Sequence, residues 1–257
     1  MKLTVLVDNN TFIDEYYLAE PALSFYIECD HKKILFDVGY SDVFLKNANK
    51  MGIDLSLCDY VVLSHGHNDH TGGLEYFNSN CPIVCHPGCF HKKYVDDLYI
   101  GSPVSVMDFE GCVEPFWLSE HLVYLGEIPR VCGFENANAI GYELVDGLKK
   151  DDYLLDDSAL VYTTNDGLFV ITGCSHSGIC NIIEYAKKVC KDSRILGVIG
   201  GMHLFGVNEQ TLDTIQYLNK CNIKDVYPCH CVSLYVKAKM LECLNVHEVG
   251  VGLSIEI

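Results

Sequence analysis

Four side chains that can bind metal fall within six residues of this chain: His65, His67, Asp69 and His70. Residues 59–63, just before them, are largely apolar and predict a buried strand that ends where the cluster begins. Side chains two apart in extended backbone point the same way, so His65 and His67 can bind one ion. Asp69 and His70 follow a turn and can face a second ion. The spacing predicts a dinuclear metal site at a strand end.

Glycines accompany this cluster. Gly66 permits a tight backbone between the first two histidines, and Gly72 with Gly73 lets the next element approach closely. We expect that element to be a helix that continues over residues 74–78.

Three more histidines, His176, His203 and His230, each stand beside glycine or cysteine just after a predicted strand. The strands are expected over 168–172, 195–199 and 226–227, and helices follow to about residue 191, over 209–220 and over 234–244. One histidine in such a place would carry little weight. Three of them, together with the cluster, favour ligands that converge on one site.

Other polar residues could serve this site. His86 follows a short predicted strand over 82–85 and could bind substrate, or it could be an ordinary loop residue. Arg130 offers the planar fork that suits phosphate or carboxylate, with a surface salt bridge as the alternative. Asp37 ends a strand predicted over 33–37 and could brace the metal loop, or it could cap a turn.

The order His-x-His-x-Asp-His at a strand end resembles the signature of the metallo-β-lactamase superfamily. The resemblance covers essentially the whole chain. It implies one domain over residues 1–257, an α/β four-layer αββα sandwich with two similar halves and the site at one edge between its sheets. Strands that alternate with helices through both halves agree with this fold class.

Within that superfamily, four segments resemble the subgroup named after the archaeal dihydropterin–ribofuranosylaminobenzene phosphate synthase: 126–130, 173–176, 200–204 and 229–231. Hydrolytic relatives carry Pro-Gly-His where this chain has Asp-Asp-Ser at 156–158, and an aspartate where it has Cys174 or His176. The resemblance therefore implies His65, His67 and His176 around one ion and Asp69, His70 and His230 around the other. Cys174, Asp157 and His203 stay open as alternatives to His176, and Cys174 is otherwise expected to support the ligands.

Such a site implies a metal-dependent hydrolase of a small ester or phosphoester. Two divalent ions, about 3.5–4 Å apart in sites of this kind, would share a hydroxide that attacks the substrate. We expect zinc, although His and Asp ligands also suit iron and manganese. Asp69 is expected to be essential, and His203 is expected to act as general acid. A synthase that joins a pterin to an aminobenzene and a non-catalytic metal or ligand sensor are the alternatives.

The composition is that of an ordinary globular protein, with 257 residues, 49% hydrophobic and 21% charged. The net charge of −17 argues against nucleic acid and anionic membranes as partners, so a small-molecule substrate is expected. The sequence does not indicate an oligomeric state. No apolar run approaches ~20 residues, and the first residues do not predict a signal peptide, so we expect a cytoplasmic protein.

Fourteen cysteines are many for such a chain, but their spacing is mostly irregular and their two clusters lack the CxxC pattern. We expect most of them to be small buried residues rather than ligands of a structural cluster. Further strands are expected over 2–7, 22–29, 121–125 and 159–163, a helix over 42–51 and edge strands over 246–257. The polar stretch 136–150 is expected to be a mobile flap.

Overall fold

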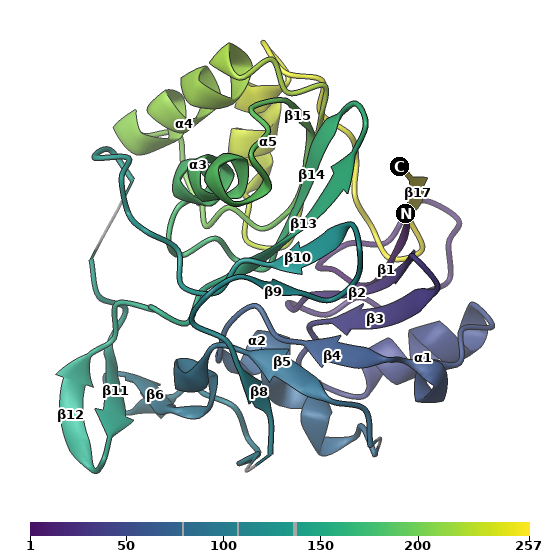
Figure 1. The fold of residues 1–257 in the computed structure, drawn as a ribbon, viewed down its shortest axis with the longest axis vertical. Helices are drawn as coiled ribbons and strands as arrows, with labels where there is room; N and C mark the ends of the chain where they lie inside the picture. The colour runs from purple at the N-terminus through teal and green to yellow at the C-terminus, as the bar shows by residue number, and fades with distance from the viewer. Residues whose placement is uncertain (79, 107, 136–137) are drawn as a thin grey trace. The chain divides into compact units, whose positions relative to one another are not determined.

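The computed structural model describes residues 1–78, 80–106, 108–135 and 138–257 (Figure 1). It divides into two compact units. The first consists of Met1–Val113, Asn138–Asp156 and Gly250–Ile257, and the second of Glu114–Ala137 and Asp157–Val249. Each unit has its own β-sheet with helices, as expected for an α/β chain with two similar halves. The single domain over 1–257 stays a prediction.

The main sheet of the first unit has seven strands. In spatial order these are β17 (Ser254–Glu256), β1 (Lys2–Val7), β2 (Ser24–Cys29), β3 (Lys32–Phe36), β4 (Tyr60–Val62), β5 (Ile83–Cys85) and β8 (Glu110–Gly111). The first three neighbouring pairs are antiparallel, while β3, β4, β5 and β8 run parallel. Parallel strands end at the same edge of a sheet, so the segments after β3, β4 and β5 come together there.

The short helices of this unit are α1 (Val43–Lys50) and α2 (Asn68–Thr71), with 3₁₀ turns η1 (Leu55–Leu57), η2 (Gly72–Glu75) and η3 (Pro87–Phe90). Helix α1 buries Phe44, Asn47 and Ala48. Phe44 and Ala48 join Leu6, Leu35 and other apolar strand residues in one core cluster. Burial of a side chain such as Phe44 stabilises the fold by roughly 1.5–3 kcal/mol.

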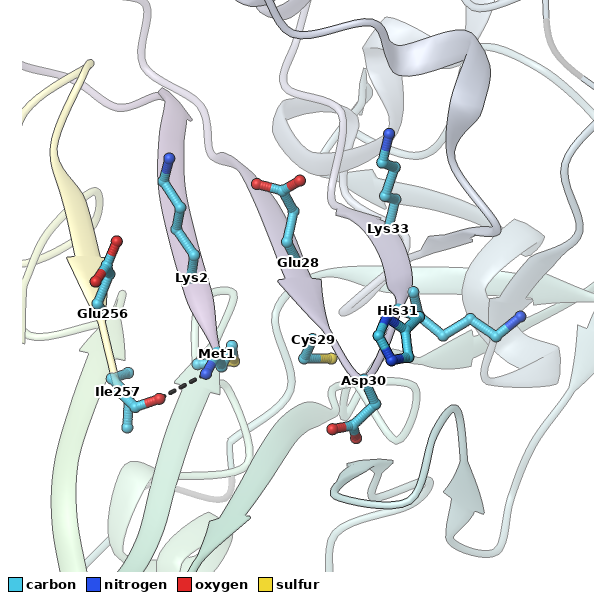
Figure 2. Close-up of a pocket in the computed structure, with 10 residues that line it drawn as sticks. Met1, Lys2, Glu28, Cys29, Asp30, His31, Lys33, Glu256 and Ile257 are labelled. Atoms are coloured by element: carbon cyan, nitrogen blue, oxygen red, sulfur yellow. Dashed lines mark hydrogen bonds between the residues drawn. The ribbon is translucent and has the colours of Figure 1, made fainter.

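A pocket of about 830 Å³ lies at one end of β1–β3, and charged side chains line it (Figure 2). Lys2 is paired across the sheet with Glu28 and Glu256, and Glu28 is paired with Lys33. Opposite charges on neighbouring strands stabilise a sheet. These pairings account for the residue types here without a ligand.

A smaller sheet in the first unit consists of β12 (Leu148–Asp151), β11 (Tyr142–Val145), β6 (Lys92–Val95) and β7 (Leu98–Tyr99). The stretch expected as a flap thus forms a hairpin from Tyr142 onward, while residues 136 and 137 lie outside the described residues. Asp146 and Gly147 both have positive φ, 52° and 76°. This Asp-Gly pair makes the tight turn that joins twisted antiparallel strands.

The second unit is built on a six-stranded sheet. Its spatial order is β16 (Asp225–Pro228), β15 (Ile195–Gly200), β14 (Gly167–Thr172), β13 (Ala159–Thr164), β10 (Leu122–Tyr124) and β9 (Phe116–Trp117). Strands β14, β15 and β16 are parallel, and the helices α3 (Ile179–Cys190), α4 (Glu209–Lys220) and α5 (Leu234–Met240) follow them in turn. Helix α3 packs on β13 and β14 and contacts α4 (Figure 1).

Most expected elements are observed with bounds shifted by one or two residues, and three differ more. The helix expected over 74–78 begins earlier, as α2 at Asn68, and gives way to η2 at Gly72. The helix expected over 234–244 ends at Met240. Of the residues 246–257 expected as edge strands, Ser254–Glu256 forms a strand, while Val246 and Val251 form single bridges with Val226 and Thr11. Gly250 and Gly252 interrupt the run, and Gly252 has a φ of 97°.

A helix with the length and apolar composition of a membrane span does not occur in the described ranges of the chain.

Candidate metal centre

The histidine cluster follows β4 directly, and backbone contacts fix its path. A Cβ atom on Gly66 would lie 2.0 Å from the Cys89 carbonyl oxygen, so only glycine fits between His65 and His67. His67 is the N-cap residue of α2, with extended backbone. At Gly72 and Gly73, a Cβ would meet the carbonyl oxygens of Tyr40 and Val38 at 2.3 and 2.1 Å. The expected role of these glycines in close approach is confirmed.

His65 and His67 bring their ring nitrogens together. His65 Nε2 lies 3.1 Å from His67 Nδ1, and the two rings are tilted by 76°. Ligand atoms of His65, His67 and Asp69 all lie within 4.8 Å of one another. Two converging imidazole nitrogens and a carboxylate form a donor set that fits a divalent cation such as zinc, iron or manganese.

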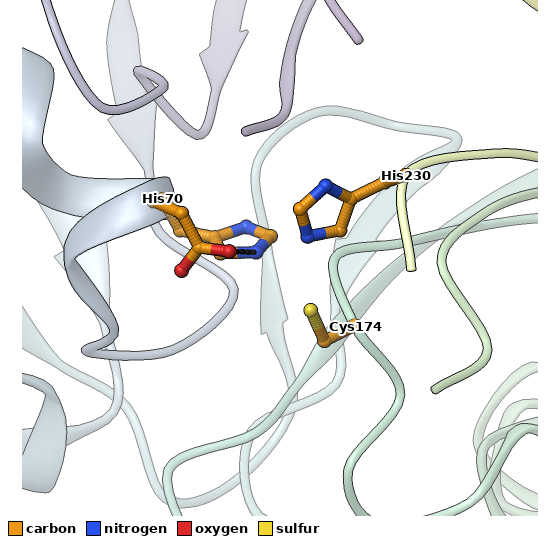
Figure 3. A group of neighbouring side chains, drawn as sticks. His70, Cys174 and His230 are labelled. Carbon is orange, nitrogen blue, oxygen red and sulfur yellow. Dashed lines mark ion pairs between the residues drawn. The ribbon is translucent and has the colours of Figure 1, made fainter. Parts of the chain in front are cut away.

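His70 is oriented by a buried acid. Its Nδ1 lies 2.6 Å from Asp37 Oδ2, while Nε2 lies 3.6 Å from Asp69 Oδ2, the ion pair dashed beside His70 in Figure 3. The Asp37 carboxylate also accepts bonds from Ser64 N and Ser64 Oγ, both at 2.7 Å. A carboxylate behind a metal-binding histidine fixes its tautomer and its orientation. The geometry supports a bracing role for Asp37.

Burial keeps His67 neutral. Desolvation lowers the pKa of His67 to about 4, even though the charges of Asp69 and Asp156 act to raise it. A neutral imidazole is the form that binds metal.

In the second unit, the carboxyl ends of β14, β15 and β16 lie together. Gly201 N donates to Gly173 O at 2.8 Å, and Cys229 N donates to Gly200 O at 3.1 Å. The rings of His176 and His203 are 4.4 Å apart. Figure 3 shows the thiol of Cys174 directed toward the ring of His230. Each histidine that sequence placed after one of these strands therefore lies at this one edge of the sheet.

The backbone at this edge is strained. Ser175, His203 and His230 have φ values of 58°, 49° and 51°. Non-glycine residues adopt this left-handed region rarely, and such strain gathers at functional sites. One non-glycine residue after each of the three strands is held in this conformation.

Cys231 ties these loops together. Its Sγ accepts a hydrogen bond from His203 N at 3.2 Å and donates to Cys174 O at 3.7 Å. A Cβ on Gly201 would lie 2.5 Å from the same sulfur. The thiol therefore fixes the loops that carry Cys174 and His203, a role that the spacing of the cysteines does not indicate.

Comparisons with known proteins identify related chains. A family model described as the metallo-β-lactamase superfamily matches residues 18–86, which include the histidine cluster. A Methanocaldococcus jannaschii protein described as uncharacterized is 32% identical over 255 residues, with 95% of each chain covered.

The chain belongs to the metallo-β-lactamase superfamily.

Two other similar proteins have more informative names. The 7,8-dihydropterin-6-methyl-4-(β-D-ribofuranosyl)-aminobenzene-5′-phosphate synthase of M. jannaschii is 29% identical over 267 residues, which cover 94% of this chain and 91% of the synthase. The crystal structure of Tm1679, a metal-dependent hydrolase of the β-lactamase superfamily, superposes with a TM-score of 0.86 at 29% identity and covers 100% of this chain and 99% of that one. The α/β fold class is confirmed.

A buried charge cluster supports the superfamily motif. Lys93 Nζ lies 2.9 Å from both Asp152 and Asp156, and Asp156 Oδ2 accepts the Gly66 N–H at 2.8 Å. Burial opposes the charge of Lys93, but attraction to the two carboxylates outweighs it and raises the Lys93 pKa. Likewise, desolvation acts to raise the Asp156 pKa, but Lys93 reverses this and lowers it. Lys93 lies in a stretch without a regular apolar pattern, so the sequence does not indicate this role.

Asp157, an open alternative ligand, supports the His176 loop. Its Oδ2 accepts bonds from Ser177 N at 2.8 Å and Ser177 Oγ at 2.5 Å. The hydrogen bonds of Asp156 and Asp157 give both residues supporting contacts beside the candidate ligands.

The two candidate substrate residues lie in different units. His86 Nδ1 accepts the Gly88 N–H at 3.0 Å and caps η3 after β5. Arg130 precedes a loop that is held to α3, because Asn181 Oδ1 accepts bonds from Val131 N and Cys132 N. The carboxylate of Glu135 caps the same helix at Cys180 N and Asn181 N, both at 2.8 Å. Substrate contacts of His86 and Arg130 stay predictions.

Proposed function

We propose that this protein is a metal-dependent hydrolase of a small ester or phosphoester. The observation that carries the proposal is the convergence of His65, His67 and Asp69 at the end of β4. The proposed site holds two divalent ions, with zinc the expected metal. His65, His67 and His176 would hold one ion, and Asp69, His70 and His230 the other.

When bound, such ions would polarise the ester oxygen and lower the pKa of water to near ~7. The protein's own residues prepare the site. The Asp37 carboxylate binds Nδ1 of His70 and so fixes the orientation of this ring. The Asp156 carboxylate accepts the Gly66 N–H and so fixes the backbone between His65 and His67. His203, beside His176, is proposed to give a proton to the leaving group, a role that histidine suits near neutral pH.

The third ligand of the first ion is proposed to be His176, with Cys174, Asp157 and His203 as the alternatives. Arg130 and His86 are proposed to contact an anionic substrate. A small molecule rather than nucleic acid is the proposed substrate, since the net charge is −17. The proposed compartment is the cytoplasm, where thiols such as those of Cys174 and Cys231 stay reduced.

Metal analysis and a substrate screen test the proposal together. Protein purified without chelators should contain two divalent ions per chain. Phosphodiester, lactone and thioester substrates should be screened with added zinc, manganese and iron. His67→Ala and Asp69→Ala should abolish turnover while the circular dichroism spectrum stays unchanged, and His247→Ala, at a histidine paired with Asp225, should keep full activity. Trace metal only, or no turnover with any metal, would refute the hydrolase.

A second candidate is a synthase that joins a pterin to an aminobenzene partner. The similarity to the M. jannaschii synthase over 94% of this chain favours it. Bound metal would then polarise a phosphate or pyrophosphate leaving group. Incubation with a pterin pyrophosphate and an aminobenzene ribofuranosyl phosphate should yield a condensed product if this candidate is right. Ester hydrolysis with no condensed product would reject it.

A further inference from the structure

A pocket of about 380 Å³ opens beside two candidate ligands within the first unit. Its lining consists of Pro21, Tyr40, His67, Asn68, Asp69 and Ile100. This volume falls in the usual range for sites that bind small molecules. Three lining residues are apolar or aromatic, and the polar ones all belong to the start of α2, so one end of the pocket borders the proposed metal centre.

Tyr40 gives this pocket an aromatic wall. The residue is 55% exposed, although its neighbours Val38 and Gly39 are buried. A tyrosine ring offers a large flat surface and loses little conformational freedom when a ligand covers it. An exposed aromatic ring next to candidate metal ligands is therefore a candidate contact for the substrate.

The backbone that carries Tyr40 is fixed to the metal motif. Glu20 Oε1 accepts the amide protons of Tyr40 at 3.0 Å and Ser41 at 3.1 Å, and Glu20 Oε2 accepts Ser41 Oγ at 2.6 Å. On the other side, Gly73 N donates to Gly39 O at 3.1 Å, in the segment that follows His70. The ring therefore starts from a backbone that is already ordered, which reduces the entropy lost on binding.

The other walls are tied to the same motif. Asn68 N donates to Ile100 O at 2.8 Å, and His67 forms a bridge with Gly101. Ile100 adds an apolar surface, and Pro21 adds another. Asn68 is half-buried, and its carboxamide can both donate and accept hydrogen bonds. One flat aromatic wall, two apolar side chains and an amide suit a planar ring that carries nitrogen atoms.

We propose that this pocket binds a flat, nitrogen-containing aromatic ring of the substrate, stacked on Tyr40 and hydrogen-bonded at its edge by Asn68. The bound ring would hold the reacting ester or phosphate near Asp69, and in this respect the inference rests on the proposed function. Tyr40 and Asn68 then determine which substrates are accepted, while the histidine cluster determines the reaction.

Ring binding can be measured without metal. Pterin, a fluorescent bicyclic nitrogen heterocycle, should be titrated into metal-depleted protein and into zinc-loaded protein while its fluorescence is followed. Tyr40→Ala should raise the dissociation constant about 5- to 100-fold, the range found when stacked aromatic side chains are replaced by alanine. Tyr40→Phe, which keeps the ring, should bind as the wild type does. Asn68→Ala should weaken binding less than Tyr40→Ala.

Tyr76→Ala is the matched control, because Tyr76 is 49% exposed in the same unit but lines a different pocket. It should bind pterin as the wild type does. The proposal is overturned if the wild type does not bind pterin in either form, or if Tyr40→Ala binds it equally well. Metal content and hydrolysis of a 4-nitrophenyl ester, measured on the same samples, report separately on the proposed function. Loss of pterin binding in Tyr40→Ala with unchanged metal content supports the ring pocket whether or not the ester is hydrolysed.

Discussion

His70 Nδ1 lies 2.6 Å from the carboxylate of Asp37, and both side chains are fully buried. The same carboxylate receives the backbone N–H and the hydroxyl of Ser64, the residue before His65. One acid therefore orients one proposed ligand and holds the loop that carries another. Asp37 itself has a left-handed φ of 55°, so the end of β3 is shaped to present this carboxylate.

Asp37→Asn should weaken metal binding because the amide is a weaker acceptor for His70 Nδ1–H. Loss of such a partner typically costs 10- to 100-fold in metal affinity. Zinc competition with a chromophoric chelator measures the change, and a thermal melt shows whether the fold survives. Asp59→Asn serves as the control, because Asp59 also lies at the end of a strand, just before β4, but its carboxylate accepts bonds from Lys32 Nζ and Lys33 N instead of a histidine. Equal zinc affinity in the two variants would contradict the role of Asp37.

The sequence predicts several strands and the local cluster of candidate ligands well, because both depend on short-range patterns. Lys2–Val7 and Glu209–Lys220 were predicted with their observed bounds, and the segment after β4 was correctly expected to carry the cluster. The features that the sequence does not predict depend on contacts between residues that are far apart in the chain. Lys93 meets Asp156 across 63 positions, and nothing in either local sequence indicates the other. Likewise, α2 begins at Asn68, whose N–H donates to the Ile100 carbonyl, and the residues that follow pack against the backbone of residues 38–40. Both contacts join segments far apart in the chain.

Lys93→Met should destabilise the protein because it leaves the buried carboxylates of Asp152 and Asp156 without their cation. Removal of one partner from a buried ion pair typically costs about 3–5 kcal/mol. Urea unfolding of metal-free protein measures this loss. Lys32→Met is the control, because its ion pair with Asp59 has side chains 40% and 31% exposed, and solvent screens such pairs so that they contribute little to stability. Similar losses of unfolding free energy in both variants would show that the buried ion cluster stabilises the protein no more than an exposed ion pair.

Gly66→Ala should displace the loop between His65 and His67. The new Cβ would meet the Cys89 carbonyl carbon at 2.8 Å as well as its oxygen at 2.0 Å, and both are backbone atoms that cannot rotate away. We expect a loss of about 1–3 kcal/mol from overpacking, together with loss of bound metal. Unfolding curves and elemental analysis measure the two effects.

Gly133→Ala is the matched control for that substitution, because nothing lies within 4 Å of a Cβ at Gly133. Its free energy of unfolding should change by no more than roughly 0.5 kcal/mol, as at ordinary surface positions. If Gly66→Ala behaves like this control, the close approach of Cys89 does not constrain the metal loop.

Metal-free protein should lose stability as the pH falls from about 6.5 to about 4, in part because of His67. Burial is the main reason that the pKa of His67 is lowered to about 4 in the folded protein, from the ordinary value of 6.5. Between these values the unfolded chain binds a proton that the folded chain does not, so acid favours unfolding; above pH 6.5 the contribution is constant. The loss could reach roughly 3 kcal/mol. Denaturant curves at pH 7 and 4.5 should differ less in His67→Asn, and an equal difference would contradict this account.

His203→Ala tests whether that histidine handles protons or binds metal. Its ring lies 4.4 Å from the ring of His176, and its backbone is held by Cys231 Sγ in a left-handed conformation. The proposed ligand set is complete without it, so metal content should stay near two ions per chain. Turnover should fall roughly 10²- to 10⁴-fold, the usual effect of losing a general acid.

The pH profile and a second variant make this test specific. A lost general acid removes the alkaline limb of the kcat profile, and a substrate whose leaving group needs no proton, such as a 4-nitrophenyl ester, should be affected least. Phe205→Ala is the control, because Phe205 also packs on the His203 ring, with centroids 4.6 Å apart, but offers no proton. Loss of one ion in His203→Ala would make His203 a ligand in place of His176. Full metal and full turnover would leave it a structural histidine that packs against His176.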